Sequence, residues 1–247
     1  MRTSQIGDWI AALASDLRSP RFLRTLARFP YTYAAEAAIA AVPQKRLDDL
    51  LPVDVAALAP LCLPHRVGRF EWNARLDEQL DLGILARGIP ARRTFEIGTF
   101  DGDMTYYLAA QMPEAHIWTL DLAPEEFDHI NVSHTFWFRG ADIGRAFRNT
   151  PEESRITQLR GNTETFDYSP WRGSMDLVFV DAAHDYAHVL QDSYNALALA
   201  RPGGWVVWHD FVPQWAGLVQ AVHKATAGLP LVRILQTTFA AVRVSAA

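Results

Sequence analysis

One segment constrains the fold of this chain more than any other. A strand-like run ends in an acid and is followed at once by a glycine-containing turn, in Thr94-Phe95-Glu96-Ile97-Gly98-Thr99-Phe100-Asp101-Gly102-Asp103-Met104-Thr105. The spacing Glu-x-Gly-x-x-x-Gly predicts a buried strand, a tight turn whose backbone a ligand can approach closely, and then a helix. It is neither the Gly-x-Gly-x-x-Gly loop of dinucleotide folds nor the phosphate loop that ends in Gly-Lys-Ser/Thr. An acid at the strand tip repels a pyrophosphate but suits a ligand with an amino group and hydroxyls.

Composition excludes several classes of protein. The chain has 247 residues, 49% of them hydrophobic, and a formal net charge of -5, which allows a full core but gives no basic footprint for nucleic acid. The single cysteine, Cys62, excludes an internal disulfide framework and favours a reducing compartment. No apolar run approaches the roughly 20 residues of a membrane span, and residues 1–17 do not resemble a signal peptide. We therefore expect a cytoplasmic protein with a small-molecule partner, bound to neither nucleic acid nor a membrane.

The chain divides near residue 90. Residues 1–90 are predicted to form a helical extension or cap, with apolar stripes at helical spacing in 6–17 and in 22–29, the second stopped by Pro30. A further amphipathic helix is expected over Glu71–Ala86. Residues 91–247 form the second predicted domain, which we expect to carry the chemistry.

Strands and helices alternate in this second domain. The alternation predicts an α/β fold with a doubly wound, mostly parallel, Rossmann-like sheet of seven strands. The expected strands are Arg93–Ile97, His116–Leu120, Arg155–Leu159, Met175–Val180, Trp205–Trp208, Leu231–Leu235 and Phe239–Val244, the last two antiparallel. The expected helices are Met104–Met112, Val189–Ala200 and 216–227. The long connection 123–153, with its aromatic run at 136–138, is expected to be a functional loop or lid.

Polar residues end several of the expected strands. Ligands of such sheets bind at the carboxyl ends of the strands, where this chain places Glu96, Asp121, Asp181 and His209-Asp210. The third strand leads to Gly161-Asn162-Thr163 at the same edge. The Asp121 carboxylate can accept hydrogen bonds from both hydroxyls of a ribose. A single acid at such a place is more often a helix cap or a solvated loop residue, but the ensemble favours a cofactor site.

The segment after the fourth strand suggests acid–base chemistry. Asp181 ends an apolar strand, and His184 follows it at a spacing that places both side chains on one side if a helix begins there. A histidine titrates near neutrality and suits a general base that takes a hydroxyl proton. Asp181 and Asp210 on adjacent strand tips could instead hold a divalent cation such as Mg²⁺, and a His209 nitrogen would favour a transition metal. Local packing of His184 and capping by Asp210 are the alternatives.

Taken in order along the chain, these segments resemble a known family. The Glu-Ile-Gly-Thr-Phe-Asp-Gly turn, Asp121, Gly161-Asn162, Val-Asp-Ala-Ala-His-Asp-Tyr and Arg-Pro-Gly-Gly-Trp-Val-Val-Trp-His-Asp are similar to those of class I S-adenosylmethionine-dependent methyltransferases. The resemblance is to the small-molecule O-methyltransferase-like branch, grouped with catechol- and macrolide-sugar-type enzymes and cephalosporin-hydroxylase-like proteins. It covers about residues 92–247 and does not extend to the N-terminal 90.

The resemblance implies a set of cofactor-binding residues. Glu96, Gly98 and Gly102 would hold the methionine end of S-adenosylmethionine, Asp121 the ribose hydroxyls, and Asn162 and Thr163 would lie beside the adenine. Asp181 would lie between cofactor and substrate. The full set of candidate cofactor-binding residues on these segments is Glu96, Gly98, Thr99, Asp101, Gly102, Thr105, Asp121, Leu122, Gly161, Asn162, Thr163 and Asp181.

The resemblance leaves two mechanisms open. In metal-dependent members the residues that match Asp181 and Asp210 are ligands, and His209 is a tentative third in this chain. His184 falls where the catechol-type enzymes have a lysine base. The chain departs from their pattern after Asp210, since Phe211 replaces a further amide ligand. With metal, Asp181 and Asp210 would hold a cation that acidifies the substrate hydroxyl. Without metal, His184 would take the proton and Asp181 would assist.

The function expected from this resemblance is O-methylation of a small natural-product, sugar or phenolic hydroxyl. An alternative is a non-catalytic or repurposed S-adenosylmethionine-binding protein of the same fold that acts in assembly or in another reaction. An NAD-dependent dehydrogenase is disfavoured, because the glycine fingerprint is missing. We also expect a homo-oligomer that forms through the N-terminal helices.

Overall fold

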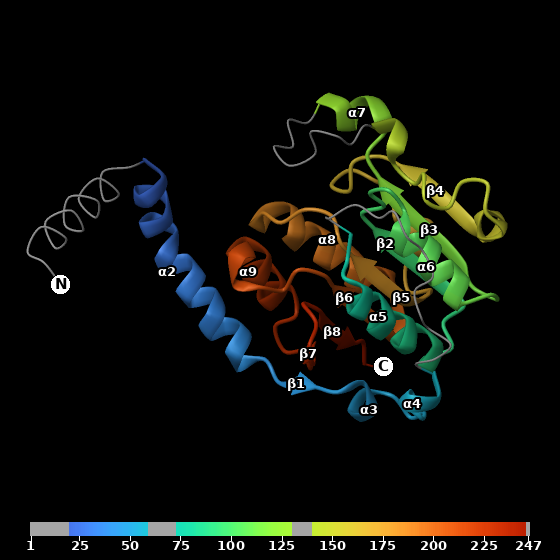
Figure 1. Cartoon of the computed structure of the whole chain (residues 1–247), viewed down its shortest axis with the longest axis horizontal. Helices are drawn as coiled ribbons and strands as arrows, with labels where there is room; N and C mark the ends of the chain where they lie inside the picture. Colours follow the sequence, from blue (N-terminus) through green and yellow to red (C-terminus); the bar gives the residue numbers. More distant parts are fainter. Residues whose placement is uncertain (1–19, 59–72, 130–139, 246–247) are drawn as a thin grey trace, which may run out of the picture.

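The computed structural model describes residues 20–58, 73–129 and 140–245 (Figure 1). The apolar stripe expected in 6–17, the single cysteine and the aromatic run at 136–138 lie outside these residues, so their predicted roles stay predictions. Among the described residues, no helix has the length and apolar character needed to cross a membrane.

A single mixed sheet organises the fold. It has eight strands in the order β1-β7-β8-β6-β5-β2-β3-β4. Their bounds are β1 Gln44–Lys45, β2 Arg93–Ile97, β3 His116–Asp121, β4 Ile156–Arg160, β5 Met175–Val180, β6 Ala200–Trp208, β7 Val232–Ile234 and β8 Ala240–Arg243. Strand β8 is antiparallel to both β6 and β7, and the other pairs are parallel. The predicted doubly wound, mostly parallel fold is therefore confirmed.

The eighth strand is the main difference from the predicted sheet of seven. Strand β1 comes from the N-terminal segment and pairs with β7 in parallel, Gln44 opposite Arg233. A strand of two exposed polar residues has no periodicity that a sequence pattern could reveal. Strand β6 also begins earlier than expected, at Ala200 rather than Trp205. The bounds of β2 and β5 agree with the prediction.

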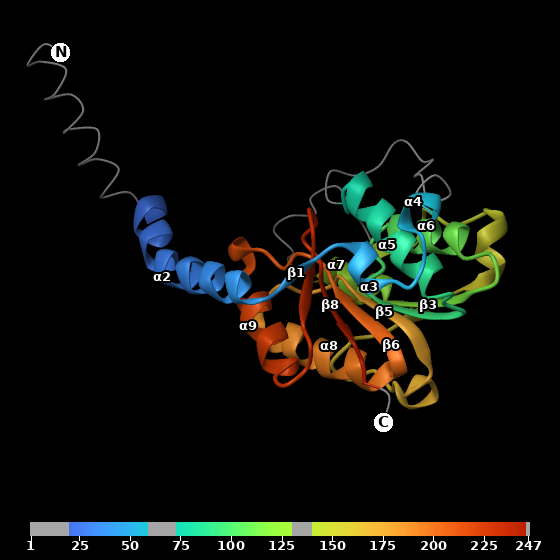
Figure 2. The ribbon, with the colours of Figure 1, turned by 90° about the horizontal axis from the view of Figure 1, so that it is seen from below.

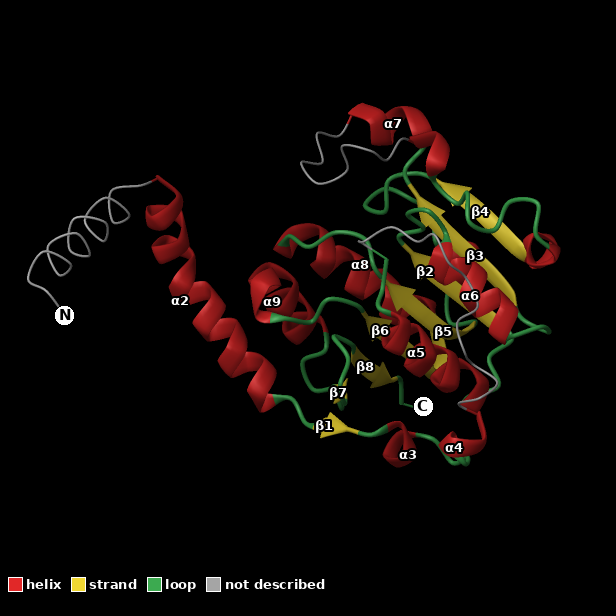
Figure 3. Cartoon of the chain, viewed as in Figure 1, coloured by secondary structure: helices red, strands yellow, loops and turns green. Residues whose placement is uncertain are grey.

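Helices cover both faces of the sheet (Figures 2 and 3). On one face lie α5 Leu76–Gly88 and α6 Asp103–Gln111, and on the other α8 Tyr186–Leu199 and α9 Ala216–Ala225. The remaining helices are α2 Pro20–Ala41, α3 Leu47–Leu50, α4 Val55–Leu58 and α7 Pro124–His129, with short 3-10 turns η2 Gly140–Asp142, η3 Pro151–Arg155, η4 Ser169–Trp171 and η5 Pro213–Trp215. Two buried apolar clusters, one on each face, share the central strands as their common wall.

Helix α2 corrects one expectation. It runs through Pro30, which was expected to stop it. A proline inside a helix costs about 3 kcal/mol because it removes a hydrogen bond and clashes with the preceding turn. The helix continues because its second half packs beside α9, where Ala35 and Ile39 are buried with the core. Figure 1 shows the first half of α2 extending away from the sheet. The division at residue 90 stays a prediction.

Candidate functional site

The acids predicted to form a site lie on neighbouring strands. Glu96 is in β2, Asp121 ends β3, Asp181 follows β5 and Asp210 follows β6, and these four strands are adjacent in the order β6-β5-β2-β3. Because parallel strands end at the same edge, the carboxyl ends of β2, β3, β5 and β6 bring these residues together. The site is thus assembled from segments far apart in the sequence.

The glycine turn is packed against the segment after β5. Gly98 has φ +99°, and a Cβ there would lie 2.0 Å from the carbonyl oxygen of Asp181. Gly102 has φ +82°, and a Cβ there would lie 2.7 Å from the ring of Phe147. Any other L-residue would be strained at both positions. These glycines therefore allow the turn to pack closely against Asp181 and Phe147.

Glu96 lies beneath this turn with an exposure of 1%. The hydroxyls of Thr105 and Thr119 both donate to its Oε2, while Oε1 has no hydrogen bond to the described residues. Burial raises the pKa of Glu96 to about 8, despite the two hydroxyl donors. The side chain is therefore a neutral acid at pH 7, with one oxygen available to a ligand.

Asp121 connects the turn to the neighbouring strand. Its Oδ2 accepts hydrogen bonds from the backbone N–H groups of Thr99 at 3.0 Å and Phe100 at 2.8 Å. Its Oδ1 accepts one from Leu122 N–H at 2.8 Å. Burial raises the pKa of Asp121, against these three donors. Since a carboxylate oxygen has two lone pairs, Oδ1 keeps acceptor capacity for a ligand hydroxyl.

Other predicted cofactor residues bind mainly to the protein itself. Asp101 accepts from Asn73 Nδ2 at 2.8 Å, so it ties the turn to the N-terminal segment. Gly161 N–H donates to the backbone oxygen of Asp121 at 2.9 Å, which places the Gly161-Asn162-Thr163 segment beside Asp121. Asn162 Oδ1 accepts from Glu164 N–H at 2.9 Å and shapes that turn.

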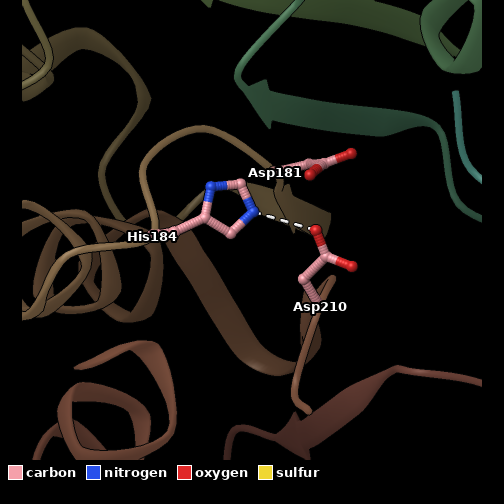
Figure 4. Close-up of side chains that lie close together, drawn as sticks. All are labelled: Asp181, His184 and Asp210. Atoms are coloured by element: carbon pink, nitrogen blue, oxygen red, sulfur yellow. Dashed lines mark hydrogen bonds and ion pairs between the residues drawn. The ribbon is translucent and has the colours of Figure 1, made fainter. Parts of the chain in front are cut away.

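Asp181, His184 and Asp210 form the second half of the site (Figure 4). His184 Nε2 lies 2.8 Å from Asp210 Oδ2, and one ligand atom from each of the three residues lies within 4.8 Å of the others. The His184 ring also lies against Trp215, with 4.4 Å between ring centroids. The side chains of His184 and Asp210 are 32% and 29% exposed, so a substrate can reach them.

His209 lies behind this group rather than within it. Its Nδ1 is 3.1 Å from Asp181 Oδ1, and its Nε2 is 3.3 Å from Glu78 Oε2. Burial acts to lower the pKa of His209. The charge and hydrogen bond of Asp181, together with the hydrogen bond to Glu78, outweigh burial and raise this pKa well above its usual value. Burial likewise acts to raise the pKa of Asp181, and the charge of His209 outweighs it and lowers the pKa.

Glu78 is the site residue that no pattern in the sequence predicts. It lies on α5, in the segment that the family resemblance does not cover, and appears there as one acid among several on an amphipathic helix. The interaction with His209 joins residues 131 positions apart. Only the folded arrangement reveals it.

The fit of a metal depends on the donors near Asp181. The group that is close enough to hold a cation is Asp181, His184 and Asp210, whereas both nitrogens of His209 are occupied by carboxylates. Two carboxylates with an imidazole suit a transition metal better than Mg²⁺, which prefers oxygen ligands. Phe211, which follows Asp210, is 3% exposed and offers no donor side chain. The oxygen-ligand site of the metal-dependent methyltransferases is therefore not reproduced.

Comparison with known proteins agrees with this geometry. Residues 95–211 match a family model described as a methyltransferase domain. Among curated proteins, caffeoyl-CoA O-methyltransferase from Pinus taeda is 26% identical over 170 residues, which cover 64% of this chain and 58% of that protein. The chain thus matches less than two thirds of that relative.

Solved structures share the fold at low sequence identity. A methyltransferase from Podospora anserina, solved with S-adenosylhomocysteine, superposes with a TM-score of 0.55 at 19% identity and covers 79% of this chain and 98% of its own. A candidate O-methyltransferase from Klebsiella pneumoniae gives a TM-score of 0.53 at 18% identity and covers 81% and 94%.

The sheet order, the glycine turn and the acids at the strand ends define a protein of the class I methyltransferase fold. Residues 95–211 match the methyltransferase-domain family model. In sequence the chain is similar to S-adenosylmethionine-dependent O-methyltransferases.

Proposed function

We propose that this protein transfers a methyl group from S-adenosylmethionine to a hydroxyl of a small molecule. The observation that carries the proposal is the hydrogen-bonded pair His184–Asp210, which lies beside Asp181. The backbone of Asp181 in turn packs against Gly98 of the turn expected to hold the cofactor. A base and a methyl donor would thus meet at one edge of the sheet.

The residues around the glycine turn fit the methionine and ribose parts of the cofactor. Glu96 Oε1 can accept a hydrogen bond from the amino group, and Asp121 Oδ1 can accept one from a ribose hydroxyl. Asn162 and Thr163 follow β4 on the side where the adenine would lie. When bound, the cofactor supplies a methyl group already activated by its sulfonium charge, so the protein mainly positions the two reactants.

The geometry favours His184 as the base. If Nε2 carries the proton that is donated to Asp210, then Nδ1, which has no hydrogen bond to the described residues, keeps its lone pair for the substrate. His184 Nδ1 would take the proton of the substrate hydroxyl, and the hydroxyl oxygen would then accept the methyl group that the bound cofactor supplies, with the cofactor released as a neutral thioether. Asp210 then stabilises the imidazolium. Because Phe211 stands where the metal-dependent enzymes have a further amide ligand, we write this route without a metal.

The chemical class of the molecule that receives the methyl group is also part of this proposal. The relative from Pinus taeda is named for a caffeoyl-CoA substrate, and we propose a phenolic, sugar or other natural-product hydroxyl for this chain. Assembly through the N-terminal helices and a cytoplasmic location stay predictions.

The direct test uses S-adenosylmethionine with a labelled methyl group and a panel of catechols, phenolic acids and hydroxylated sugars. We expect S-adenosylhomocysteine and one labelled methyl ether to form in equal amounts, and His184→Ala to stop the reaction without loss of cofactor binding. Cofactor binding by calorimetry with no turnover on any acceptor would favour the alternative, a non-catalytic or repurposed cofactor-binding protein. Absence of cofactor binding would contradict both.

A further inference from the structure

Glu78 is a buried acid that reaches the site from outside the methyltransferase domain. It lies on α5 with an exposure of 1%, and residues 95–211 form the matched domain. Its carboxylate accepts three hydrogen bonds: Oε2 from Arg75 N–H at 3.1 Å and from His209 Nε2 at 3.3 Å, and Oε1 from Thr238 N–H at 2.8 Å. The bond from Arg75 N–H caps the first turn of α5. The other two partners, His209 and Thr238, lead to residues of the site.

The first branch ends at Asp181. A histidine with a carboxylate at each ring nitrogen donates from both nitrogens, and His209 has Glu78 on one side and Asp181 on the other. His209 Nδ1 also lies 3.7 Å from Asp210 Oδ2. The ring is held among buried aromatic side chains, with centroids 6.2 Å from Phe179 and 5.5 Å from Phe239. The direction of this ring is therefore fixed, and with it the place of the Asp181 carboxylate.

The second branch ends at Asp210. Thr238 Oγ1 accepts a hydrogen bond from Asp210 N–H at 3.3 Å, and Thr238 O accepts one from Phe211 N–H at 2.8 Å. Asp210 has φ +56°, a left-handed conformation that a non-glycine residue adopts at a cost and keeps only when its surroundings impose it. This conformation aims the Asp210 carboxylate at His184. Thr238, which is hydrogen-bonded to Glu78, is one of the residues that impose this conformation on Asp210.

We propose that Glu78 is a positioning residue that holds both carboxylates of the site in place. It acts on Asp181 through His209 and on Asp210 through Thr238. The inference rests on the proposed function, since the positioned groups are those that would carry methyl transfer. It also gives the N-terminal segment a role in the chemistry, because the carboxylate that holds the site together comes from α5.

Two variants with controls test the proposal in the full chain. Glu78→Gln keeps the side-chain volume, but its amide has only one acceptor oxygen and cannot accept hydrogen bonds from both His209 and Thr238. We therefore expect kcat to fall by about tenfold to a hundredfold. The KM for S-adenosylmethionine should stay within about twofold. Asp77→Asn makes the same charge change on the exposed side of α5 and should leave both constants unchanged. Thr238→Val breaks only the second branch and should lower kcat, whereas Thr238→Ser should restore it.

A spectroscopic readout does not depend on knowing the acceptor. Proton NMR of the wild-type protein should show two slowly exchanging ring N–H signals of His209, and Glu78→Gln should lose or shift the Nε2–H signal while Asp77→Asn keeps it. Unchanged kcat and unchanged ring signals in Glu78→Gln would overturn the inference. If the wild-type protein turns over no acceptor, the proposed function fails, and the ring signals still decide whether Glu78 holds His209.

Discussion

His184 and Asp210, 26 positions apart in the sequence, are joined by a hydrogen bond of 2.8 Å between Nε2 and Oδ2. The two residues come from different segments, His184 from the loop before α8 and Asp210 from the loop that follows β6. The bond leaves the other ring nitrogen for a substrate and gives the histidine the carboxylate partner typical of general bases.

The first prediction concerns His184 itself. His184→Ala removes the proton acceptor, so kcat should fall by about 10²- to 10⁴-fold, while the affinity for S-adenosylmethionine measured by calorimetry stays unchanged. His188→Ala is a matched control, because His188 is an exposed histidine of the same segment whose partners are Asp185 and Glu164. Equal loss of activity in both variants would argue against a specific base.

Asp121 provides the second prediction. Asp121→Ala removes both the proposed ribose acceptor and the acceptor of the Thr99 and Phe100 N–H groups, so we expect affinity for S-adenosylmethionine to fall at least about tenfold. Glu125→Gln, an acid in the first turn of α7, should leave the affinity unchanged. Calorimetric titration of both variants decides the point, and an unaltered dissociation constant for Asp121→Ala would remove the ribose assignment.

Metal removal is the third prediction. Because His184 is a base within reach of Asp210 and Phe211 offers no ligand, activity should survive exhaustive chelation, and added Mg²⁺ should not increase it. Activity is measured on protein whose metal content has been determined. Loss of turnover on chelation, restored by Mn²⁺ or another transition metal, would assign Asp181, His184 and Asp210 as ligands instead.

The strands that carry the site and the acids at their ends could be predicted from the sequence, whereas the hydrogen bonds between them could not. The strands that carry the site are buried on both faces, so their apolar runs are distinctive, and β5 was predicted with the bounds that it has. The acids at their ends then follow from topology alone, because parallel strands end at one edge. Their hydrogen bonds do not follow from it. Asp121 was expected to bind the ribose hydroxyls of a cofactor, and the structure shows that it also holds the glycine turn.

The missed features lack a local signal. Strand β1 is too short for a period to show, and Pro30 is a helix breaker that tertiary packing overrides. Glu78 has the sequence environment of a surface acid, and it is buried only because α5 packs on one face of the sheet. Long-range partners such as His209 and Thr238 cannot be inferred from a single chain without its fold.

The fourth prediction uses the raised pKa of Glu96, which burial brings to about 8. In the free protein this acid is protonated at pH 7, and a cofactor ammonium placed at Oε1 would favour its charged form and lower the pKa. Binding of S-adenosylmethionine should therefore release close to one proton at pH 7, and affinity should increase as the pH rises from 6 to 8. Calorimetry in buffers of different ionisation enthalpy measures this release. Glu96→Gln should abolish the proton release, and release that persists in this variant would place the proton elsewhere.

The last prediction concerns Asp192, a buried acid of α8 with an exposure of 1%. Neither of its carboxylate oxygens has a hydrogen bond of good geometry within the described part of the chain. Burial raises its pKa to about 6, against the opposing influence of Thr163. As the pH rises from about 4 to 6, the unfolded chain loses this proton before the folded chain does, so the folded state loses stability over that window and does not regain it above.

Asp192→Asn removes this titration. The variant should be more stable than the wild-type protein at pH 8, by about 1 to 3 kcal/mol in the free energy of unfolding, and the difference should shrink towards pH 4. Urea denaturation at both pH values measures it, with Asp167→Asn, a loop acid whose carboxylate already accepts a hydrogen bond from Ser169 N–H, as the control. A variant less stable at pH 8 would mean that the Asp192 carboxylate has a binding partner in solution, and the residues nearest to it, beginning with Thr163, would then be the place to look for one.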